Sequence, residues 1–300
     1  MSPSAGRLVL ALAALNLLGY VDRQLVAVLA PLLIAELGLS RAQVGLLVGA
    51  AFIVVFALGT LAMGALADRW SRTRIIAWGL AGWSAGTGLS GTASGFLSLA
   101  AFRSLVGIGE ATLSPSALVL LAERVPPERL GFASSLFYAG IPVGFACSFA
   151  LAGWLAPRLG WRACFYVLGL SGLLAVALVS RMRETRPCSS PAPAAPGPVA
   201  GTVLRRLRAA LGEQPALAPV ALGGALLAYA SASSQHAITW LVQERGFQYA
   251  RAAWLSAAVV AGAGLLGNVS LGFLSDRVRR GPGKGRLPAF VGAGTLALAA

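Results

Sequence analysis

Charged side chains are scarce in this chain of 300 residues: they make up 11% of it, whereas 57% of the residues are hydrophobic. A soluble globular domain carries charge on about 25% of its residues. The mean hydropathy is +0.76, and a surface of that composition could not be kept in water. The composition therefore excludes a soluble globular enzyme.

Cysteine and histidine are also rare, with three cysteines and one histidine. The cysteines show no CxxC or other metal-ligand spacing, and the sequence holds no nucleophile–base set and no Walker motif. Gly107 and Gly109 lie inside an apolar run, where they favour close helix packing over a phosphate loop. We therefore expect no disulfide framework, metal site, cofactor, enzymatic activity or ATP-driven pumping by this chain alone.

Long apolar runs are what the sequence has instead. A helix rises about 1.5 Å per residue, so about 20 apolar residues cross a bilayer core. The runs are unbroken rather than alternating, which favours helices over the strands of a barrel. They predict an all-α polytopic membrane protein with part of a ninth helix from about Leu287, after eight complete spans at 8–34, 43–66, 75–94, 96–121, 131–155, 162–180, 216–242 and 252–274.

Positive charge dominates the little charge there is, with a formal net charge of +14 and a pI of about 11.4. Such basicity indicates nucleic-acid binding when it gathers on one face. With a cytoplasmic N-terminus, 17 of the 24 Lys and Arg fall in cytoplasmic loops, 5 in outer loops and 2 inside apolar runs. The positive-inside rule then predicts that orientation, and we expect no nucleic-acid partner.

One long cytoplasmic loop, 182–215, divides the chain. It carries the segment SSPAPAAPGP, followed by three arginines at helical spacing within Arg205–Arg208. This pattern predicts a flexible linker with a short basic amphipathic helix on the inner leaflet, or a disordered linker alone. The expected domains are a six-helix half at 1–181, the linker, and the start of a second half at 216–300.

A short repeat links the two expected halves. Gly64–Arg72 (GALADRWSR) follows the second apolar run, and Gly272–Arg280 (GFLSDRVRR) follows the eighth, with five of nine positions identical at an offset of 208. At that offset a complete second half ends near position 389. We therefore expect a chain truncated by about three and a half helices.

Both copies resemble the loop signature of the major facilitator superfamily, G-x-x-x-D-R-x-G-R-[RK], from which Ser71 and Thr73 depart. The resemblance implies the major facilitator fold, with twelve helices in two six-helix halves around a central cavity. It also implies a gating role for the loops. The alternative is a basic cytoplasmic loop with an incidental aspartate. The loop residues marked in this way are Gly64, Asp68, Arg69, Arg72, Gly272, Asp276, Arg277 and Arg280.

Three further segments narrow the resemblance to the spinster family of lysolipid transporter-like proteins. Residues 102–111 (FRSLVGIGEA), followed by Ser114-Pro115, are similar to its R-x-L-V-G-x-G-E-A segment. Residues 16–23 (NLLGYVDR) resemble its N-x-x-x-Y-x-D-R, and residues 137–144 (FYAGIPVG) resemble its F-Y-x-x-I-P-x-G. Together these segments cover most of the first expected half.

Four ionisable residues lie inside apolar runs: Asp22, Arg23, Arg103 and Glu110. Charges in a membrane are costly, so they normally face the interior of a helix bundle and mark function. Arg103 and Glu110 are seven residues apart, or about 10.5 Å along one helix, which is too far for a tight pair. We therefore expect each to find a partner on another helix, with Asp22 and Arg23 as the candidates.

The spinster resemblance implies that Asp22, Arg103 and Glu110 line the cavity and that the carboxylates carry protons, and we count Arg23 as a candidate of the same site. A desolvated carboxylate stays ionised only while a cation is near. Our hypothesis is that Asp22 and Glu110 alternate between Arg-paired and protonated states, which frees Arg103 to bind an anionic head group or to change partners as the two halves rock. The alternative is a static buried salt bridge that fixes helix packing.

Six further residues are candidate cavity contacts. Three belong to the spinster-like segments, and three lie in the seventh run, which the superfamily places along the cavity. For the histidine among them, a local hydrogen bond is the alternative role. The six are Asn16, Tyr20, Ser114, Gln235, His236 and Trp240.

Together these observations predict a monomeric secondary active transporter in the lipid bilayer of a bacterial inner membrane. It moves a small or amphipathic organic solute by alternating access, with the proton as coupling ion. The resemblance implies a lysophospholipid-like or organic-anion substrate. The alternatives are a drug or metabolite efflux pump, an organic-anion importer of another branch and, from another class, a non-transporting membrane receptor or an inactive gene fragment.

Overall fold

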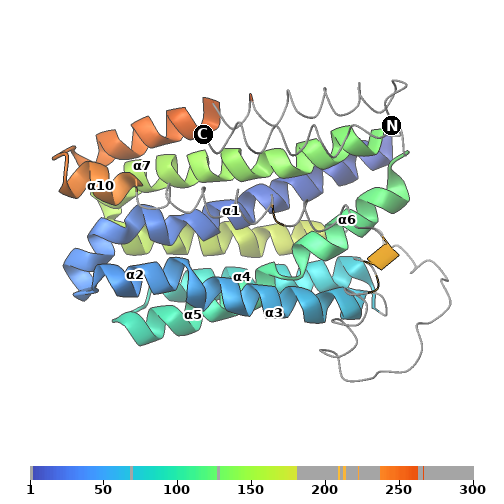
Figure 1. The fold of residues 1–300 in the computed structure, drawn as a ribbon, viewed down its shortest axis with the longest axis horizontal. Coiled ribbons are helices and arrows are strands. Elements are labelled where there is room, and N and C mark those ends of the chain that lie inside the picture. The colour runs from blue at the N-terminus through green and yellow to red at the C-terminus, as the bar shows by residue number, and fades with distance from the viewer. Residues whose placement is uncertain are drawn as a thin grey trace. The chain divides into compact units, whose positions relative to one another are not determined.

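The computed structural model describes residues 3–67, 70–126, 129–180 and 237–262, together with positions 209, 212–213, 222 and 266. These residues are helical almost throughout, and the long helices run side by side (Figure 1). Residues 249–262 form a further helical stretch. The helices are α1 (Pro3–Leu37), α2 (Arg41–Val48), α3 (Ala50–Ala67), α4 (Arg72–Ser90), α5 (Phe96–Glu110), α6 (Leu113–Arg124), α7 (Leu130–Ser180) and α10 (Ala237–Gln243).

The contacts divide the chain into two units. The first comprises Met1–Pro187 with His236–Ser270, and the second comprises Cys188–Gln235 with Leu271–Ala300. Only four described residues fall in the second unit, so the architecture below is that of the first. The expected linker lies almost entirely outside the described residues, and the domain boundaries drawn from the sequence stay predictions.

The six apolar runs of the expected first half are all helical, but two of them are not continuous helices. The second run is interrupted at Gly49, between α2 and α3. The fourth run is interrupted at Ala111 and Thr112, between α5 and α6. The predicted spans at 43–66 and 96–121 thus each contain a local break, while Arg41–Met63 and Phe96–Arg124 are still long and apolar enough to cross a membrane.

Helix α7 contains the fifth and sixth runs. It changes direction at Gly160, whose φ of 80° lies in the left-handed region that glycine adopts without steric cost. Its first arm packs on α1, where a Cβ on Gly144 would lie 2.7 Å from the carbonyl oxygen of Leu17. Its second arm packs on α4, where a Cβ on Gly169 would lie 2.8 Å from the carbonyl oxygen of Ser84. The glycines thus allow these backbones to approach closely.

Four helical segments of the described part are long and apolar enough to cross a membrane: Ala5–Leu37, Arg41–Met63, Phe96–Arg124 and Leu130–Ser180. Helix α4 was also predicted as a span, and it is more polar than these. Its Ser84, Thr87 and Ser90 are all buried within the bundle. The polarity of α4 therefore faces other helices, which is where a membrane protein can satisfy it.

The core consists of two apolar clusters stacked along the helices. On α1, one cluster includes Leu15 and the other Leu25. On α5, the cluster changes in the same way between Leu99 and Val106. Arg103 lies where the clusters change on α5, whereas Asp22 and Arg23 directly follow Val21, which belongs to the same cluster as Leu25, and Glu110 lies beyond Val106. The charged residues are thus set among the apolar residues of both clusters.

Candidate functional site

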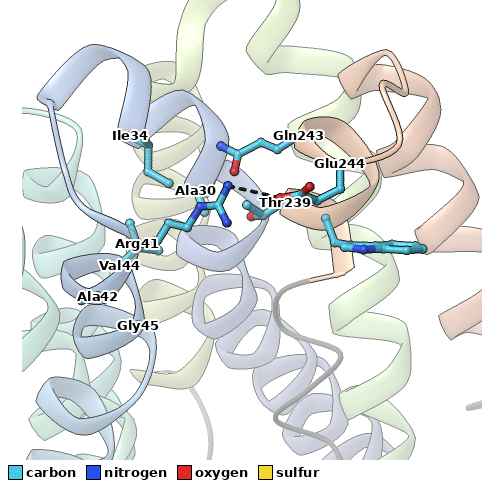
Figure 2. Close-up of a pocket in the computed structure, with 10 residues that line it drawn as sticks. Ala30, Ile34, Arg41, Ala42, Val44, Gly45, Thr239, Gln243 and Glu244 are labelled. Carbon is cyan, nitrogen blue, oxygen red and sulfur yellow. Dashed lines mark hydrogen bonds and ion pairs between the residues drawn. The ribbon is translucent and has the colours of Figure 1, made fainter.

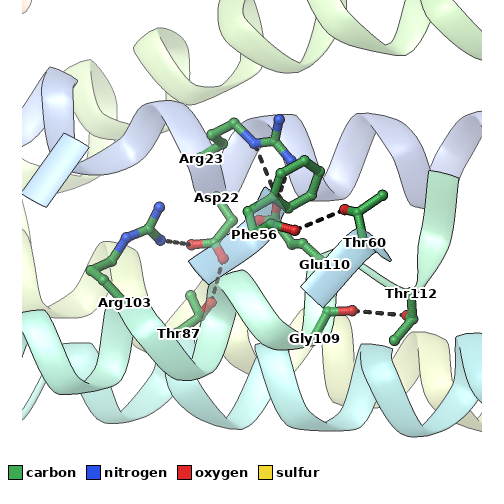
Figure 3. A network of polar contacts seen from close by, with 9 residues as sticks. All are labelled: Asp22, Arg23, Phe56, Thr60, Thr87, Arg103, Gly109, Glu110 and Thr112. Atoms are coloured by element: carbon green, nitrogen blue, oxygen red, sulfur yellow. Dashed lines mark hydrogen bonds and ion pairs between the residues drawn. The ribbon is translucent and has the colours of Figure 1, made fainter. Parts of the chain in front are cut away.

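The middle of the bundle holds two ion pairs that join α1 to α5. In the first, Arg103 Nη1 lies 3.3 Å from Asp22 Oδ1, and both side chains are only 1% exposed. The hydroxyl of Thr87, on α4, lies 2.6 Å from the other carboxylate oxygen of Asp22. Figure 3 shows Asp22 between Arg103 and Thr87. Three helices therefore meet at one fully enclosed carboxylate.

The second pair joins the neighbouring residue of α1 to the end of α5. Arg23 donates from Nε at 3.1 Å and from Nη2 at 2.6 Å, both to Oε2 of Glu110. The Glu110 side chain is 3% exposed, whereas that of Arg23 is 25% exposed. The second oxygen of Glu110, Oε1, is buried and has no hydrogen-bond partner among the described residues. This carboxylate thus depends on a single arginine.

Aromatic rings surround the Arg23 guanidinium. Its Cζ lies 4.7 Å from the ring centroid of Tyr20, 5.0 Å from that of Phe52 and 4.5 Å from that of Phe56. The Cζ of Arg103 also lies 5.0 Å from the Phe52 ring. Ring faces attract cations, and the attraction strengthens when both partners are desolvated. The rings therefore help hold two arginines in an apolar setting.

A close backbone approach sets the position of Glu110. A Cβ on Gly109 would lie 2.6 Å from the carbonyl oxygen of Gly79 and 2.6 Å from the backbone nitrogen of Trp83. Only a glycine fits there without a shift, so α5 lies directly against α4 just before Glu110. The prediction that Gly109 serves helix packing is confirmed.

The predicted site residues divide by where the structure places them. Asp22, Arg23, Arg103 and Glu110 come together, each paired across a helix boundary as expected. Tyr20 joins them through its ring. Two contacts that the sequence did not single out, Thr87 and the Phe52–Phe56 pair, complete the group. The polar spacing of Ser84, Thr87 and Ser90 on α4 is the sequence signal that could have found Thr87.

The other candidate cavity contacts lie elsewhere. Asn16 is 4% exposed and donates from Nδ2 to the carbonyl oxygen of Phe137 at 2.8 Å, which ties α1 to α7. Ser114 is half-buried beyond the break after Glu110, so it does not continue a straight stripe with that residue. Gln235 and His236 lie outside the described residues.

Trp240 lies on α10 and lines a pocket at the end of the bundle where α1 ends at Leu37. Figure 2 shows the α1, α2 and α10 side chains that converge there. The pocket has a volume of about 440 Å³, and Arg41 and Glu244 form a 3.4 Å ion pair beside it. None of the four central charged residues lines it.

Little of the loop signature can be compared with the structure. Gly64 lies in the last turn of α3. Asp68, Arg69 and the whole second copy, Gly272 to Arg280, lie outside the described residues. Arg72 is 9% exposed and pairs with Glu123 at the end of α6. A gating role for the signature stays a prediction. Within the described ranges, no three His, Cys, Asp or Glu side chains gather as a metal site would require.

The fold and the buried charges define a class: a polytopic helical membrane protein with two buried ion pairs inside its bundle. Comparison with known proteins gives the family, because a model of the major facilitator superfamily matches residues 12–300. The chain belongs to the major facilitator superfamily.

Individual relatives differ in function. The chain is 30% identical over 268 residues to an MFS-type efflux pump of Mycolicibacterium smegmatis, a match that covers 89% of this chain and 61% of the pump. It is 29% identical over 285 residues to the 3-(3-hydroxy-phenyl)propionate transporter of Escherichia coli K12, covering 93% of this chain and 68% of the transporter.

The structure is similar to that of a bacterial homolog of the human lysosomal transporter Spinster, solved in an inward-facing, occupied conformation. The two share a TM-score of 0.76 and 27% sequence identity, over 96% of this chain and 64% of that one. The resemblance to the spinster family is thus confirmed. The chain spans less than two thirds of the length of the efflux pump and of the Spinster homolog.

Proposed function

We propose that this chain belongs to a secondary active transporter that moves a small or amphipathic organic solute across the membrane by alternating access, coupled to protons. It acts as a carrier and not as an enzyme. The observation that carries the proposal is the pair of buried ion pairs between α1 and α5. Charges in the middle of apolar helices are costly and are retained where they serve transport.

Proton coupling follows from the surroundings of Glu110. A buried carboxylate stays ionised while a cation stabilises it, and takes a proton when that cation leaves. Glu110 has one such partner, Arg23, and its second oxygen has no hydrogen bond among the described residues. A rearrangement that takes the Arg23 side chain away from Glu110 would therefore load Glu110 with a proton. Asp22, held by Arg103 and Thr87, would change state less readily.

The solute is proposed to carry an anionic group, as a lysophospholipid or an organic acid does. Two arginines that both lie against the Phe52 ring support this choice, and so does the similarity to a 3-(3-hydroxy-phenyl)propionate transporter and to a Spinster homolog. Drug efflux is the second candidate, since the M. smegmatis relative is an efflux pump. A receptor, or an inactive fragment in which the ion pairs only fix packing, would show no transport.

Transport in proteoliposomes tests the proposal. The product of the complete reading frame that encodes this chain is reconstituted, and uptake of 3-phenylpropionate, lysophosphatidylglycerol and a cationic dye is followed with and without an imposed pH gradient. We expect protein-dependent uptake of an anionic probe that the gradient accelerates. Movement of the dye alone would favour drug efflux, and no movement of any probe would contradict a transport function.

The membrane and its orientation are part of the proposal. We place the chain in a bacterial inner membrane as a monomer, with its N-terminus in the cytoplasm, because basic residues concentrate in alternate loops. Attaching a reporter that is active only in the cytoplasm to the N-terminus, or within the loop at 181–208, should give a signal at both positions. A signal from a reporter placed after Leu37 would contradict this orientation.

A further inference from the structure

We infer that the pocket at the Leu37 end of the bundle is a second binding site, which takes a monoanion with an apolar body. The anionic group binds Arg41 in exchange for Glu244, and the body lies against an apolar wall formed by α1 and α2. None of the four central charged residues lines this pocket, so the site is separate from the central ion pairs. The role of the site in transport rests on the proposed function, whereas binding itself does not depend on transport.

The pocket has the size and the two kinds of wall that such a ligand needs. Its volume of about 440 Å³ lies within the range of small-molecule sites, about 300–1,000 Å³. The apolar wall includes Ala30 and Ile34 of α1 and Val44 of α2. On the other side, α10 contributes the indole of Trp240. An apolar body can therefore be covered from both sides while its charged group stays at the polar edge.

The charge at the polar edge favours an anion. Arg41 reaches from α2 toward Glu244, as Figure 2 shows, and Glu244 is the one acidic residue that lines the pocket in the described part of the chain. A second cation, Arg245, lies with its Cζ 4.7 Å from the ring centroid of Trp240. Two cations and one anion give the edge a formal charge of +1, which a monoanion would neutralise. Arg41 is also the first residue of α2, where the helix dipole adds positive potential.

The contact between Arg41 and Glu244 is weak enough to be exchanged. The Nη2 atom of Arg41 lies 3.4 Å from Oε1 of Glu244, and both side chains are exposed. Strong hydrogen bonds between a guanidinium and a carboxylate measure about 2.7–2.9 Å and are often bidentate. A ligand carboxylate or phosphate can therefore offer Arg41 a better contact than Glu244 does, and water already reaches both residues.

The backbone on either side of the polar edge is set before a ligand arrives. Gly38, between α1 and α2, has a φ of 64°, and Gly246, after α10, has a φ of 67°. Both lie in the left-handed region that glycine adopts without steric cost. Ser40 then caps α2: its hydroxyl accepts from the backbone nitrogen of Gln43 at 3.1 Å, and its own backbone nitrogen donates to the Gln43 side chain at 2.9 Å. Arg41 follows directly, so little ordering is needed on binding.

Gly45 allows the pocket to be filled by substitution. It lines the pocket, and a Cβ at this position meets no atom within 4 Å beyond its own helical turn. Glycine is also a poor helix former, so a larger side chain does not weaken α2. Gly45→Leu should therefore occupy the space of the ligand and leave the fold intact. Gly82→Leu on α4 is the matched control, because Gly82 has equally open surroundings and does not line the pocket.

Equilibrium dialysis tests the site. The purified product of the complete reading frame, in detergent, receives radiolabelled 3-phenylpropionate, and the amount bound per mole of protein is measured. We expect Gly45→Leu to bind one mole less than Gly82→Leu, and the neutral 3-phenylpropionamide not to compete at this site. Lysophosphatidylglycerol as a competitor distinguishes a lipid from a free acid as the source of the anion. Equal binding by the two leucine variants would overturn the inference.

Two charge variants should change the affinity in opposite directions. Arg41→Gln should weaken binding at this site about tenfold, because it removes the hydrogen bonds to the anion. Glu244→Gln should tighten it by about twofold to fivefold, because the competing carboxylate of an exposed pair is gone. An ion pair that only holds α2 to α10 would give weaker binding in both variants. Weaker or unchanged binding in Glu244→Gln would therefore overturn the exchange at Arg41.

Uptake into proteoliposomes separates this inference from the proposed function. If the pocket is the place where the solute first binds, Arg41→Gln should raise the KM for 3-phenylpropionate and leave kcat unchanged. Transport by the wild type, together with equal binding by Gly45→Leu and Gly82→Leu, would overturn the pocket site and leave the transport function intact. Binding that Gly45→Leu abolishes, without transport of any probe, would support the site and contradict the transport function.

Discussion

The ion pairs in the middle of the bundle and those at its Leu37 end consist of the same residue types in different surroundings. The central pairs, Asp22–Arg103 and Arg23–Glu110, have side chains between 1% and 25% exposed. The end pair Arg41–Glu244 is 71% and 54% exposed. Exposed pairs contribute about 0–1 kcal/mol, whereas loss of one partner of a buried pair costs about 3–5 kcal/mol. The expected contribution of an ion pair to stability therefore depends here on how far it is desolvated and not on which residue types form it.

The two central pairs also differ from each other. Asp22 is held by Arg103 and Thr87 and closed off from solvent, which suits a group that keeps its charge. Glu110 has one ion-pair partner among the described residues, Arg23, whose side chain is 25% exposed. A bundle that must keep its shape and still exchange a proton gains from this division, since one pair can open while the other holds the helices.

The largest expected effect on stability comes from breaking the Asp22–Arg103 pair, which is closed off from solvent. Arg103→Gln should lower the free energy of unfolding by about 3–5 kcal/mol, because it leaves the Asp22 carboxylate buried without a cation. Thermal unfolding in detergent, followed by circular dichroism, measures it. The double variant Arg103→Gln with Asp22→Asn should recover much of the loss, since no net charge is then buried. A double variant as unstable as the sum of the singles would show that the pair is not coupled.

A smaller loss is expected at the hydroxyl that supports Asp22. Thr87→Val keeps the shape of the side chain and removes a hydrogen bond to a charged group, which contributes about 1.5–3 kcal/mol. Thr60→Val is the matched control, because within the part of the chain that the structure describes the Thr60 hydroxyl donates to the Phe56 carbonyl of its own helix, at 2.8 Å, and to no charged group. Equal melting temperatures for the two variants would contradict a supporting role for Thr87.

The next smaller effect is expected where α5 packs closely against α4 at Gly109. Gly109→Ala would place a Cβ 2.6 Å from backbone atoms of α4, and such overpacking costs about 1–3 kcal/mol. The shift of α5 should also weaken proton-driven uptake, because Glu110 is the next residue. Gly82→Ala on α4 is the control, as no described residue outside its own helical turn lies within 4 Å of the Cβ that it adds. Wild-type stability and uptake in Gly109→Ala would show that the central ion pairs tolerate a wider spacing between α4 and α5.

The four residues of the central ion pairs, Asp22, Arg23, Arg103 and Glu110, could be predicted from the sequence because they are the four charged residues within the apolar runs of the expected first half. Which arginine pairs with which carboxylate could not be predicted. Asp22 and Arg23 are adjacent on a helix and point about 100° apart, so the rotation of α1 against α5 decides which residue meets which partner. Sequence patterns do not give that rotation, because it follows from how all the helices pack together.

The helix breaks, Thr87 and the two phenylalanines also could not be predicted from the sequence. The breaks at Gly49 and after Glu110 interrupt runs that are equally apolar on both sides, so hydropathy does not mark them. Thr87 was missed because serine and threonine are ordinary residues in membrane helices and carry no charge signal. Phe52 and Phe56 are ordinary lipid-facing residues by composition, and only their contact with Arg23 distinguishes them.

The smallest expected effect is at the Leu37 end, and it tests the comparison most directly. A double-mutant cycle with Arg41→Gln and Glu244→Gln should give a coupling of about 0.2–1 kcal/mol. Raising the salt concentration to 1 M should abolish it, because the screening length falls to about 3 Å. The cycle on Asp22 and Arg103 should be unchanged by the same salt, since ions do not reach a pair that is 1% exposed. A salt-resistant coupling above about 2 kcal/mol for Arg41 and Glu244 would mean that this pair is enclosed in solution. Burial as the dividing line between the two kinds of ion pair would then have to be abandoned.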